Sequence, residues 1–214
     1  MPKYTSGPTG YPTYWLRAKK ELKAADPVIA DIIKACGRGG LVGKGDPFVT
    51  LVRSIVAQQI SVRAAESIWS RLEEAAGGIS PEFVAARDEA ELQGAGLTQR
   101  KASYIRDIAV AFLDGRVAPT MWHAKDDEGV ITELVGLRGI GRWTAEMFLI
   151  FHLLRPNILP LDDIGLIRAC ERHYTAGEKM TREEIKQVAE CWQPWCTVAT
   201  WYLWRSIDPT PVAY

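Results

Sequence analysis

The sequence predicts an all-α fold made of two helical subdomains. Apolar residues recur at the three- and four-residue spacing of helices along most of the chain, and little of it alternates as a strand would. Glycine and proline interrupt this pattern, most densely at residues 37–47. We therefore place a boundary there and expect one central subdomain at 47–155. The other combines residues 1–46 and 156–214.

The expected helices follow one another through short connectors. Ser80 is a good N-cap, and Pro81 suits the first turn of the helix that it opens. Residues 155–160 are expected to form an extended connector, because residues before proline avoid the α region. The other helices are expected at 15–24, 27–35, 48–57, 62–75, 88–95, 99–113, 128–135, 141–154, 162–174, 181–191 and 194–207.

The overall charge gives no sign of a nucleic-acid partner. The 214 residues include 26 basic and 26 acidic side chains, so the formal net charge is zero. Net charge governs solubility and non-specific association more than a local site. A nucleic-acid binder with this composition would have to gather its cations on one face.

Composition also argues against a membrane protein and a metalloprotein. No apolar run reaches membrane-span length, and no apolar stretch follows Lys3 as in a secretory signal. We expect a soluble cytoplasmic monomer with no membrane partner. The four cysteines and three histidines are scattered, so no metal site built from side chains is expected. The thiols are expected to be reduced and buried.

Residues 134–146 form the most informative motif. Two predicted helices meet at a tight turn in which Gly139 and Gly141 flank Ile140. Glycine permits positive φ and close approach of another backbone. Ile140 is expected to turn inward and pin the two helices together. An ordinary αα-hairpin whose glycines only make the turn is the alternative.

The charge around this turn favours a phosphate ligand. A second helix begins at the turn, and its unpaired N–H groups form an anion site. Arg138 and Arg142 add positive charge, and Thr144 follows in the new helix. An apolar residue between two glycines, followed by this helix, is the form of a DNA-binding helix-hairpin-helix.

The sequence resembles the helix-hairpin-helix DNA glycosylase superfamily, and within it the alkylpurine (3-methyladenine) DNA glycosylases. The resemblance spans 48–205 and is densest at 57–62, at the hairpin and at 159–166. It implies two helical subdomains flanking a DNA-binding cleft. It also implies base flipping, hydrolysis of the N-glycosidic bond of alkylated purines (3-methyladenine or 7-methylguanine type) and release of DNA with an abasic site.

One carboxylate is expected to carry the chemistry. Asp163 lies 22 residues after Gly141, and alignment with the family places the catalytic residue there. Bond cleavage develops oxocarbenium character on the sugar, which a fixed anion stabilises. The same group can orient or deprotonate the attacking water. Asp162 is then expected to be the helix N-cap, although the opposite order stays open.

The resemblance implies a monofunctional enzyme. Some superfamily members also cut the strand with a Lys two residues after the second hairpin glycine. Trp143 stands at that position, so no amine is available there for a Schiff base.

The same resemblance implies an aromatic base pocket. A purine methylated at N3 or N7 is cationic, and a cation over an indole gains about 0.5–2 kcal/mol. Packing in the core is the alternative for Trp143 and Met147, which follow helical spacing, and a core also tolerates Trp. The pocket residues implied are Trp143, Met147, Ile164 and Trp204.

The resemblance also implies a set of DNA contacts. Gln99, or alternatively Leu97, is expected to fill the gap left by the flipped nucleotide. Gln59 is expected to contact the gap or the opposite strand, unless it is buried and caps a kink. Arg100 and Lys101 would join the hairpin arginines in a basic face. The full expected set is Gly139, Gly141, Arg138, Arg142, Thr144, Gln59, Ser61, Leu97, Gln99, Arg100 and Lys101.

No cofactor is expected to be required. The resemblance allows a structural Na⁺ or K⁺ on the main-chain carbonyls of Val135, Leu137 and Ile140. The expected partner is double-stranded DNA with damaged bases, met in the cytoplasm (at the nucleoid in a bacterium). Two alternatives stay open: a glycosylase of this fold for hypoxanthine or an oxidised or mismatched base, and a non-catalytic DNA-binding module.

Overall fold

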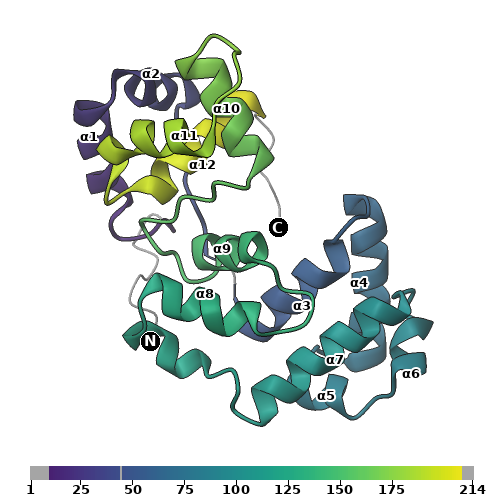
Figure 1. The fold of residues 1–214 in the computed structure, drawn as a ribbon. Helices are drawn as coiled ribbons and strands as arrows, with labels where there is room; N and C mark the ends of the chain where they lie inside the picture. The colour runs from purple at the N-terminus through teal and green to yellow at the C-terminus, as the bar shows by residue number, and fades with distance from the viewer. Residues whose placement is uncertain (1–9, 44, 209–214) are drawn as a thin grey trace. The chain divides into compact units, whose positions relative to one another are not determined.

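A computed structural model describes residues 10–43 and 45–208. Over these ranges the chain forms twelve α-helices and two short 3₁₀ helices, with no β-strand (Figure 1). The all-α prediction is confirmed. No helix in the described ranges is long and apolar enough to cross a membrane.

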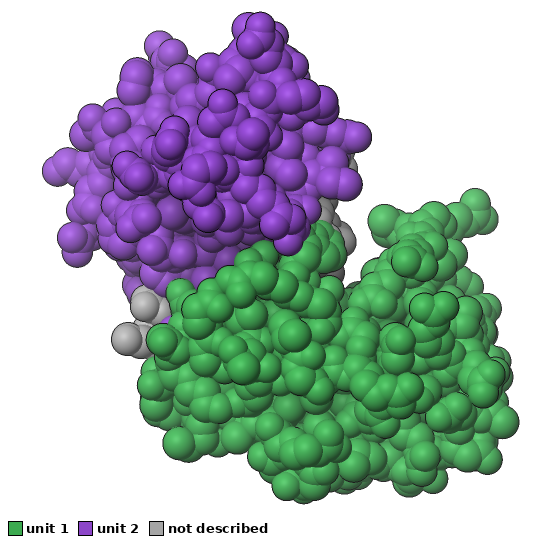
Figure 2. All heavy atoms as spheres, viewed as in Figure 1, with its two compact units in different colours: residues 1, 44–148, 214 green, residues 2–43, 149–213 purple. Residues whose placement is uncertain are grey.

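The described chain divides into two compact units (Figure 2). Unit 1 holds residues 45–148, and unit 2 holds residues 10–43 together with 149–208. The chain passes from one unit to the other within α9 (Arg142–Phe151). The division into subdomains expected at 47–155 and at 1–46 with 156–214 remains a prediction.

Unit 1 is built around α7, which packs against α3, α5 and α6, while α3 also packs against α4. The apolar face predicted for α3, from Phe48 to Val56, is buried. Phe48 meets Phe112 of α7 edge to face, with ring centroids 5.3 Å apart. The helices are α3 (Pro47–Ala57), α4 (Val62–Ala76), α5 (Pro81–Ala85), α6 (Glu89–Gly94), α7 (Gln99–Leu113), η1 (Pro119–Ala124), α8 (Asp127–Val135) and the start of α9.

In unit 2, α12 packs against α1, α2 and α10. Trp15 and Tyr202 lie fully buried between them, with ring centroids 6.0 Å apart. The helices are α1 (Trp15–Ala25), α2 (Pro27–Cys36), α10 (Ile164–Tyr174), α11 (Arg182–Ala189), η2 (Glu190–Trp192) and α12 (Cys196–Ile207).

Asp26 joins three elements of unit 2 through one buried carboxylate. Its Oδ1 accepts the N–H groups of Val28, at 2.8 Å, and Ile29, at 3.2 Å, and so caps α2. Its Oδ2 accepts the Tyr174 hydroxyl at 2.6 Å and the Trp192 indole N–H at 2.7 Å. Burial, followed by the bond to Asp26, raises the pKa of Tyr174. A buried carboxylate is tolerated here because hydrogen-bond donors surround it.

The predicted helices match the observed ones closely, with a few differences. The helix expected at 141–154 covers only 142–151, and the one expected at 181–191 ends at 189 in a 3₁₀ turn. The 3₁₀ helix η1 was not predicted. Burial raises the pKa of Cys170 and Cys196 to about 12. Cys191 is exposed, so the expectation that the cysteines are buried is wrong for it.

Candidate active site and DNA interface

The turn between α8 and α9 requires glycine at its centre. Gly139 has φ +88°, and a Cβ on it would lie 2.3 Å from Cδ2 of Tyr104 on α7. The Gln58 side-chain amide donates to the Gly139 carbonyl at 3.0 Å. Leu137 and Ile140 are buried, as expected for Ile140. The turn is therefore fixed to α7 and to the end of α3 within unit 1.

Gly141 differs from Gly139. It is exposed, and a Cβ built on it would meet no atom within 4 Å. Glycine is not required there, because a side chain would have room and the backbone φ is not positive. The exposed backbone at the start of α9 fits the expected phosphate contact, which remains a prediction.

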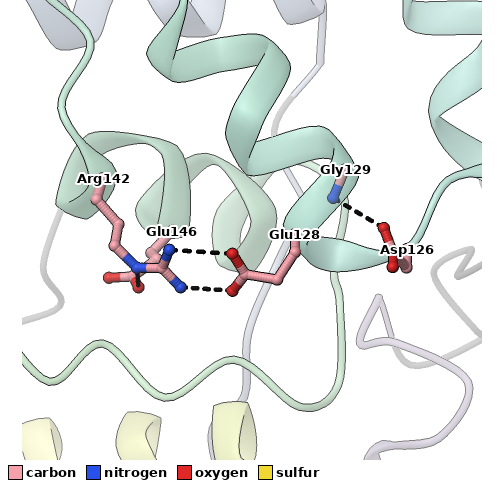
Figure 3. Close-up of polar contacts among 5 residues, drawn as sticks. All are labelled: Asp126, Glu128, Gly129, Arg142 and Glu146. Carbon is pink, nitrogen blue, oxygen red and sulfur yellow. Dashed lines mark hydrogen bonds and ion pairs between the residues drawn. The ribbon is translucent and has the colours of Figure 1, made fainter.

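The two hairpin arginines are already engaged. Arg142 lies between Glu128 of α8, 3.0 Å from Nη1 to Oε2, and Glu146 of α9, 3.0 Å from Nε to Oε1 (Figure 3). The bond to Glu128 raises the pKa of Arg142 further above its usual range. Arg138 pairs with Asp107 at 2.8 Å. These acidic partners reduce the positive charge that either arginine offers to DNA.

Lys101 is also engaged, since its ammonium donates to the carbonyls of Val56 and Gln58, both at 2.8 Å. Burial lowers its pKa. Arg100 is exposed and has no ion pair among the described residues. The expected basic face of these four residues remains a prediction. Three of the four have polar partners in this structure, and Arg100 is the member without an ion pair in the described ranges.

The loop that leads into α7 corrects another expectation. Leu97 is only 5% exposed, so the alternative that it fills the gap in DNA is wrong for this conformation. Gln99 is exposed as the first residue of α7. Its role as the inserted side chain remains a prediction.

The loop between α3 and α4 presents a second candidate. Gln59 is exposed and has φ +58°, a conformation that residues other than glycine rarely adopt. The alternative that Gln59 is buried is wrong, whereas Gln58 is partly buried and holds the hairpin. The Ser61 hydroxyl accepts the Ala64 N–H and so caps α4. The Thr144 side chain, expected to contact DNA, is buried in α9.

Asp163, in unit 2, is the N-cap of α10. Its Oδ1 accepts the Leu166 N–H at 2.7 Å and the Trp204 indole N–H at 2.6 Å, and the residue is only 5% exposed. The expectation that Asp162 is the cap is therefore wrong. The Asp162 side chain is 43% exposed and pairs with Arg182 of α11.

Trp204 is fixed on more than one side. Its ring stacks on Phe151, with centroids 5.8 Å apart and planes 9° from parallel. A Cβ on Gly165 would lie 3.0 Å from both Asp163 Oδ1 and Trp204 Cδ1. Glycine therefore lets the indole reach the carboxylate.

Comparison with known proteins places this arrangement in a family. Residues 52–194 match the model of the HhH-GPD superfamily base excision DNA repair proteins. The chain belongs to the HhH-GPD superfamily. The matched segment contains the hairpin, the loop between α3 and α4, and Asp163.

The HhH-GPD relatives include several alkylbase enzymes. DNA-3-methyladenine glycosylase 1 of Schizosaccharomyces pombe is 30% identical over 76% of this chain and 73% of its own length. A Bacillus subtilis relative is 32% identical over 74% of this chain, which spans only 58% of that relative's length. A crystal structure of DNA-3-methyladenine glycosidase from Bacillus halodurans has a TM-score of 0.84 and 35% identity, over 89% of each chain.

Another similar solved structure contains DNA. It is the S. pombe 3-methyladenine DNA glycosylase in complex with abasic DNA, with a TM-score of 0.77 and 27% identity. The aligned region covers 89% of this chain and 96% of that one.

The residues expected to line the base pocket lie in both units. Trp143 and Met147 are one helical turn apart on α9 in unit 1, and Met147 is buried. Ile164 is 62% exposed beside Asp163, and Trp204 is buried, both in unit 2. The joint role of these four in holding a base remains a prediction.

Sequence reasoning missed three contacts of this HhH-GPD site. Tyr104 and Gln58 hold the Gly139 turn, and Phe151 holds Trp204. Both contacts of the turn come from residues far away in the sequence. Local spacing therefore gives no signal for them.

Proposed function

We propose that this chain is a monofunctional DNA glycosylase of base excision repair that hydrolyses the N-glycosidic bond of alkylated purines. The observation that carries the proposal is the fixing of Asp163 by two hydrogen bonds, from Leu166 and Trp204, in a chain of the HhH-GPD superfamily. The names of its relatives support an alkylated purine such as 3-methyladenine as the released base.

Asp163 is the proposed catalytic residue. Both fixed donors bind Oδ1, so the plane of the carboxylate is set before substrate arrives. A preorganised anion stabilises oxocarbenium character on the sugar without rearranging during the reaction. The same carboxylate orients the attacking water and accepts its proton. A cationic methylated purine is already a good leaving group, so the reaction depends less on a separate general acid.

Strand cleavage is not part of the proposal. Trp143 follows Gly141 at the position where lyase members of the family carry Lys. An indole nitrogen forms no Schiff base, so the product is an intact strand with an abasic site.

Double-stranded DNA with damaged bases is the proposed partner. The exposed backbone at Gly141 contacts a phosphate, and Arg100 adds an unpaired cation. The target nucleotide must leave the stack, and a side chain then fills the gap. Exposed Gln59 is well placed on its loop for this role, with exposed Gln99 as the second candidate. The proposed place of action is the cytoplasm, at the nucleoid if the chain is bacterial.

The substrate range depends on the proposed pocket. Phe151 covers one face of Trp204, and Asp163 accepts its N–H. Trp204 is therefore committed to the carboxylate and stacks on a base with the opposite face only. Met147 and Ile164 offer apolar contact in place of further aromatic rings. Hypoxanthine and oxidised or mismatched bases belong in the substrate panel for this reason.

A monovalent cation at the hairpin is a separate proposal. The carbonyls of Val135, Leu137 and Ile140 would hold Na⁺ or K⁺. The Leu137 oxygen already accepts the Ile140 N–H at 3.1 Å, which leaves it a second lone pair. The ion would add positive charge beside the phosphate. Weaker binding of abasic DNA in tetramethylammonium than in potassium at equal ionic strength is expected.

The decisive experiment compares two neighbouring carboxylates. Alkylated DNA is incubated with the wild type, Asp163→Asn and Asp162→Asn, and released 3-methyladenine and 7-methylguanine are measured. Asn keeps the cap of α10, so Asp163→Asn folds. It should release base at least about 100-fold more slowly, as for loss of a main electrostatic group. Asp162→Asn should retain activity, because Asp162 pairs with Arg182 on the surface. Equal release by all three would refute the assignment, and tight binding without release of any base would favour a non-catalytic module.

A further inference from the structure

Lys101 closes the C-terminal end of α3. Its Nζ lies 2.8 Å from the carbonyl oxygen of Val56 and 2.8 Å from that of Gln58. The last carbonyls of a helix lack partners within the helix, and positive charge there is stabilising. Lys101 is the third residue of α7 and reaches back more than forty residues in the sequence to supply both bonds.

The residue that follows this contact has a constrained backbone. Gln59 adopts φ +58° and is exposed. A non-glycine residue keeps such a conformation only where its surroundings enforce it, often at a functional site. Its neighbour Gln58 is held twice, by Lys101 at its carbonyl and by the Gly139 carbonyl at its side-chain amide, 3.0 Å away. Gln59 is thus presented outward from a fixed base.

We propose that Lys101 is a positioning residue that holds the loop of residues 58–61, so that Gln59 enters the gap left by the flipped nucleotide. The proposal rests on the proposed glycosylase function, and it replaces the direct DNA contact that was expected of Lys101. Two of the three ammonium N–H bonds are used by main-chain carbonyls. Burial favours the neutral amine and lowers its pKa, which also distinguishes Lys101 from a free phosphate-binding cation.

Arg100 provides the matched comparison. It is adjacent in the sequence and exposed, with no ion pair in the described parts of the chain. A phosphate contact reveals itself in the salt dependence of binding, whose logarithmic slope falls by about 1 when the contact is removed. Removing a positioning residue leaves this slope unchanged and instead reduces insertion of Gln59 into the gap.

The test uses duplex DNA with an uncleavable abasic-site analogue and 2-aminopurine beside it. Fluorescence change at saturating protein reports insertion, and titrations at several salt concentrations give the slope. Lys101→Met should lose at least half of the amplitude with an unchanged slope, whereas Arg100→Met should lower the slope by about 1. Gln59→Ala should lose the same amplitude as Lys101→Met. The double variant should lose no more than Gln59→Ala alone, because both act through one side chain.

The outcomes separate the two proposals. A slope lowered by about 1 in Lys101→Met, with full amplitude, would make Lys101 a phosphate contact and overturn the inference. Additive losses in the double variant would also overturn it. If Lys101→Met does not fold, Lys101→Gln replaces it, and the same comparisons apply. Full wild-type amplitude without release of any base would refute the glycosylase proposal alone, because this assay requires no turnover.

Discussion

The indole N–H of Trp204 and the backbone N–H of Leu166 bind the same oxygen of Asp163, at 2.6 and 2.7 Å. Trp204 therefore orients the carboxylate, in addition to any role as a stacking surface for a base. Hydrogen bonds to a charged group contribute about 1.5–3 kcal/mol each. Loss of this bond should therefore be measurable separately from loss of the ring.

Trp204→Phe separates the two roles, because phenylalanine keeps an aromatic ring against Phe151 and removes the donor. Single-turnover excision should slow by about 10–100-fold, with affinity for abasic DNA changed less than about 3-fold. The control is Trp201→Phe, which alters another tryptophan of α12, packed against Tyr202. Unchanged excision by Trp204→Phe would show that the hydrogen bond does not orient Asp163.

The two hairpin glycines should differ in their effect on stability. Gly139→Ala places a Cβ 2.3 Å from Tyr104 at φ +88° and should lower the free energy of unfolding by about 2 kcal/mol or more. Gly141→Ala meets no atom within 4 Å and should change it by less than about 0.5 kcal/mol. Urea denaturation of both variants measures this difference. Equal destabilisation would contradict the described packing of Tyr104 on the turn.

Two helix-capping aspartates provide a second matched pair, since Asp26 and Asp46 each precede a proline that opens a helix. Asp46→Ala removes an exposed cap and should cost about 1 kcal/mol. Asp26→Ala also removes the oxygen that accepts both the indole N–H of buried Trp192 and the Tyr174 hydroxyl. It should cost about 3 kcal/mol or more. Similar losses in thermal or urea unfolding would mean that the Asp26 network adds nothing beyond the cap.

Glu133 should make the stability of the protein depend on pH. Burial raises the pKa of its carboxyl, but bonds from Lys125, Trp122 Nε1 at 2.8 Å and the Ala118 N–H at 3.2 Å outweigh burial and lower the pKa overall. Because the pKa is lower in the folded state, ionised Glu133 stabilises the fold at pH values above its unfolded-state pKa, near 4.5. This stabilisation is lost as the pH falls through the folded-state pKa.

Glu133→Gln tests this dependence. At pH 7 the free energy of unfolding of this variant should be about 1–3 kcal/mol lower than that of the wild type, because Gln lacks the charged acceptor. The difference should shrink as the pH falls below about 4.5 towards the folded pKa. Urea unfolding across this range provides the measurement, and a difference independent of pH would exclude the carboxylate as its cause.

Local signals predicted the helices well. Both ends of α7, at Gln99 and Leu113, match the expectation, because Thr98 is an N-cap and Asp114-Gly115 ends the apolar pattern. The family was also predicted correctly, since the hairpin and the spacing to Asp163 are local sequence features.

Contacts between distant residues were not predictable. Lys101 was expected to contact DNA, because the local sequence gives no sign of its carbonyl partners, which lie 43 and 45 residues away. Asp162 and Asp163 have equal intrinsic preference for a cap, and it is the bond from the Leu166 N–H in the folded chain that identifies Asp163 as the cap. Leu97 was offered as an inserted side chain, but packing buries it.

The capping role of Asp163 also affects how this protein can evolve. Catalytic groups are often a burden on the folded state, so that replacing them increases stability at the expense of activity. Asp163 caps α10 and accepts a buried indole donor, so removing its side chain would weaken the scaffold together with the proposed chemistry. Selection for a stable fold would therefore preserve a capping side chain at this position, Asp or Asn, even in periods when the damaged base is rare.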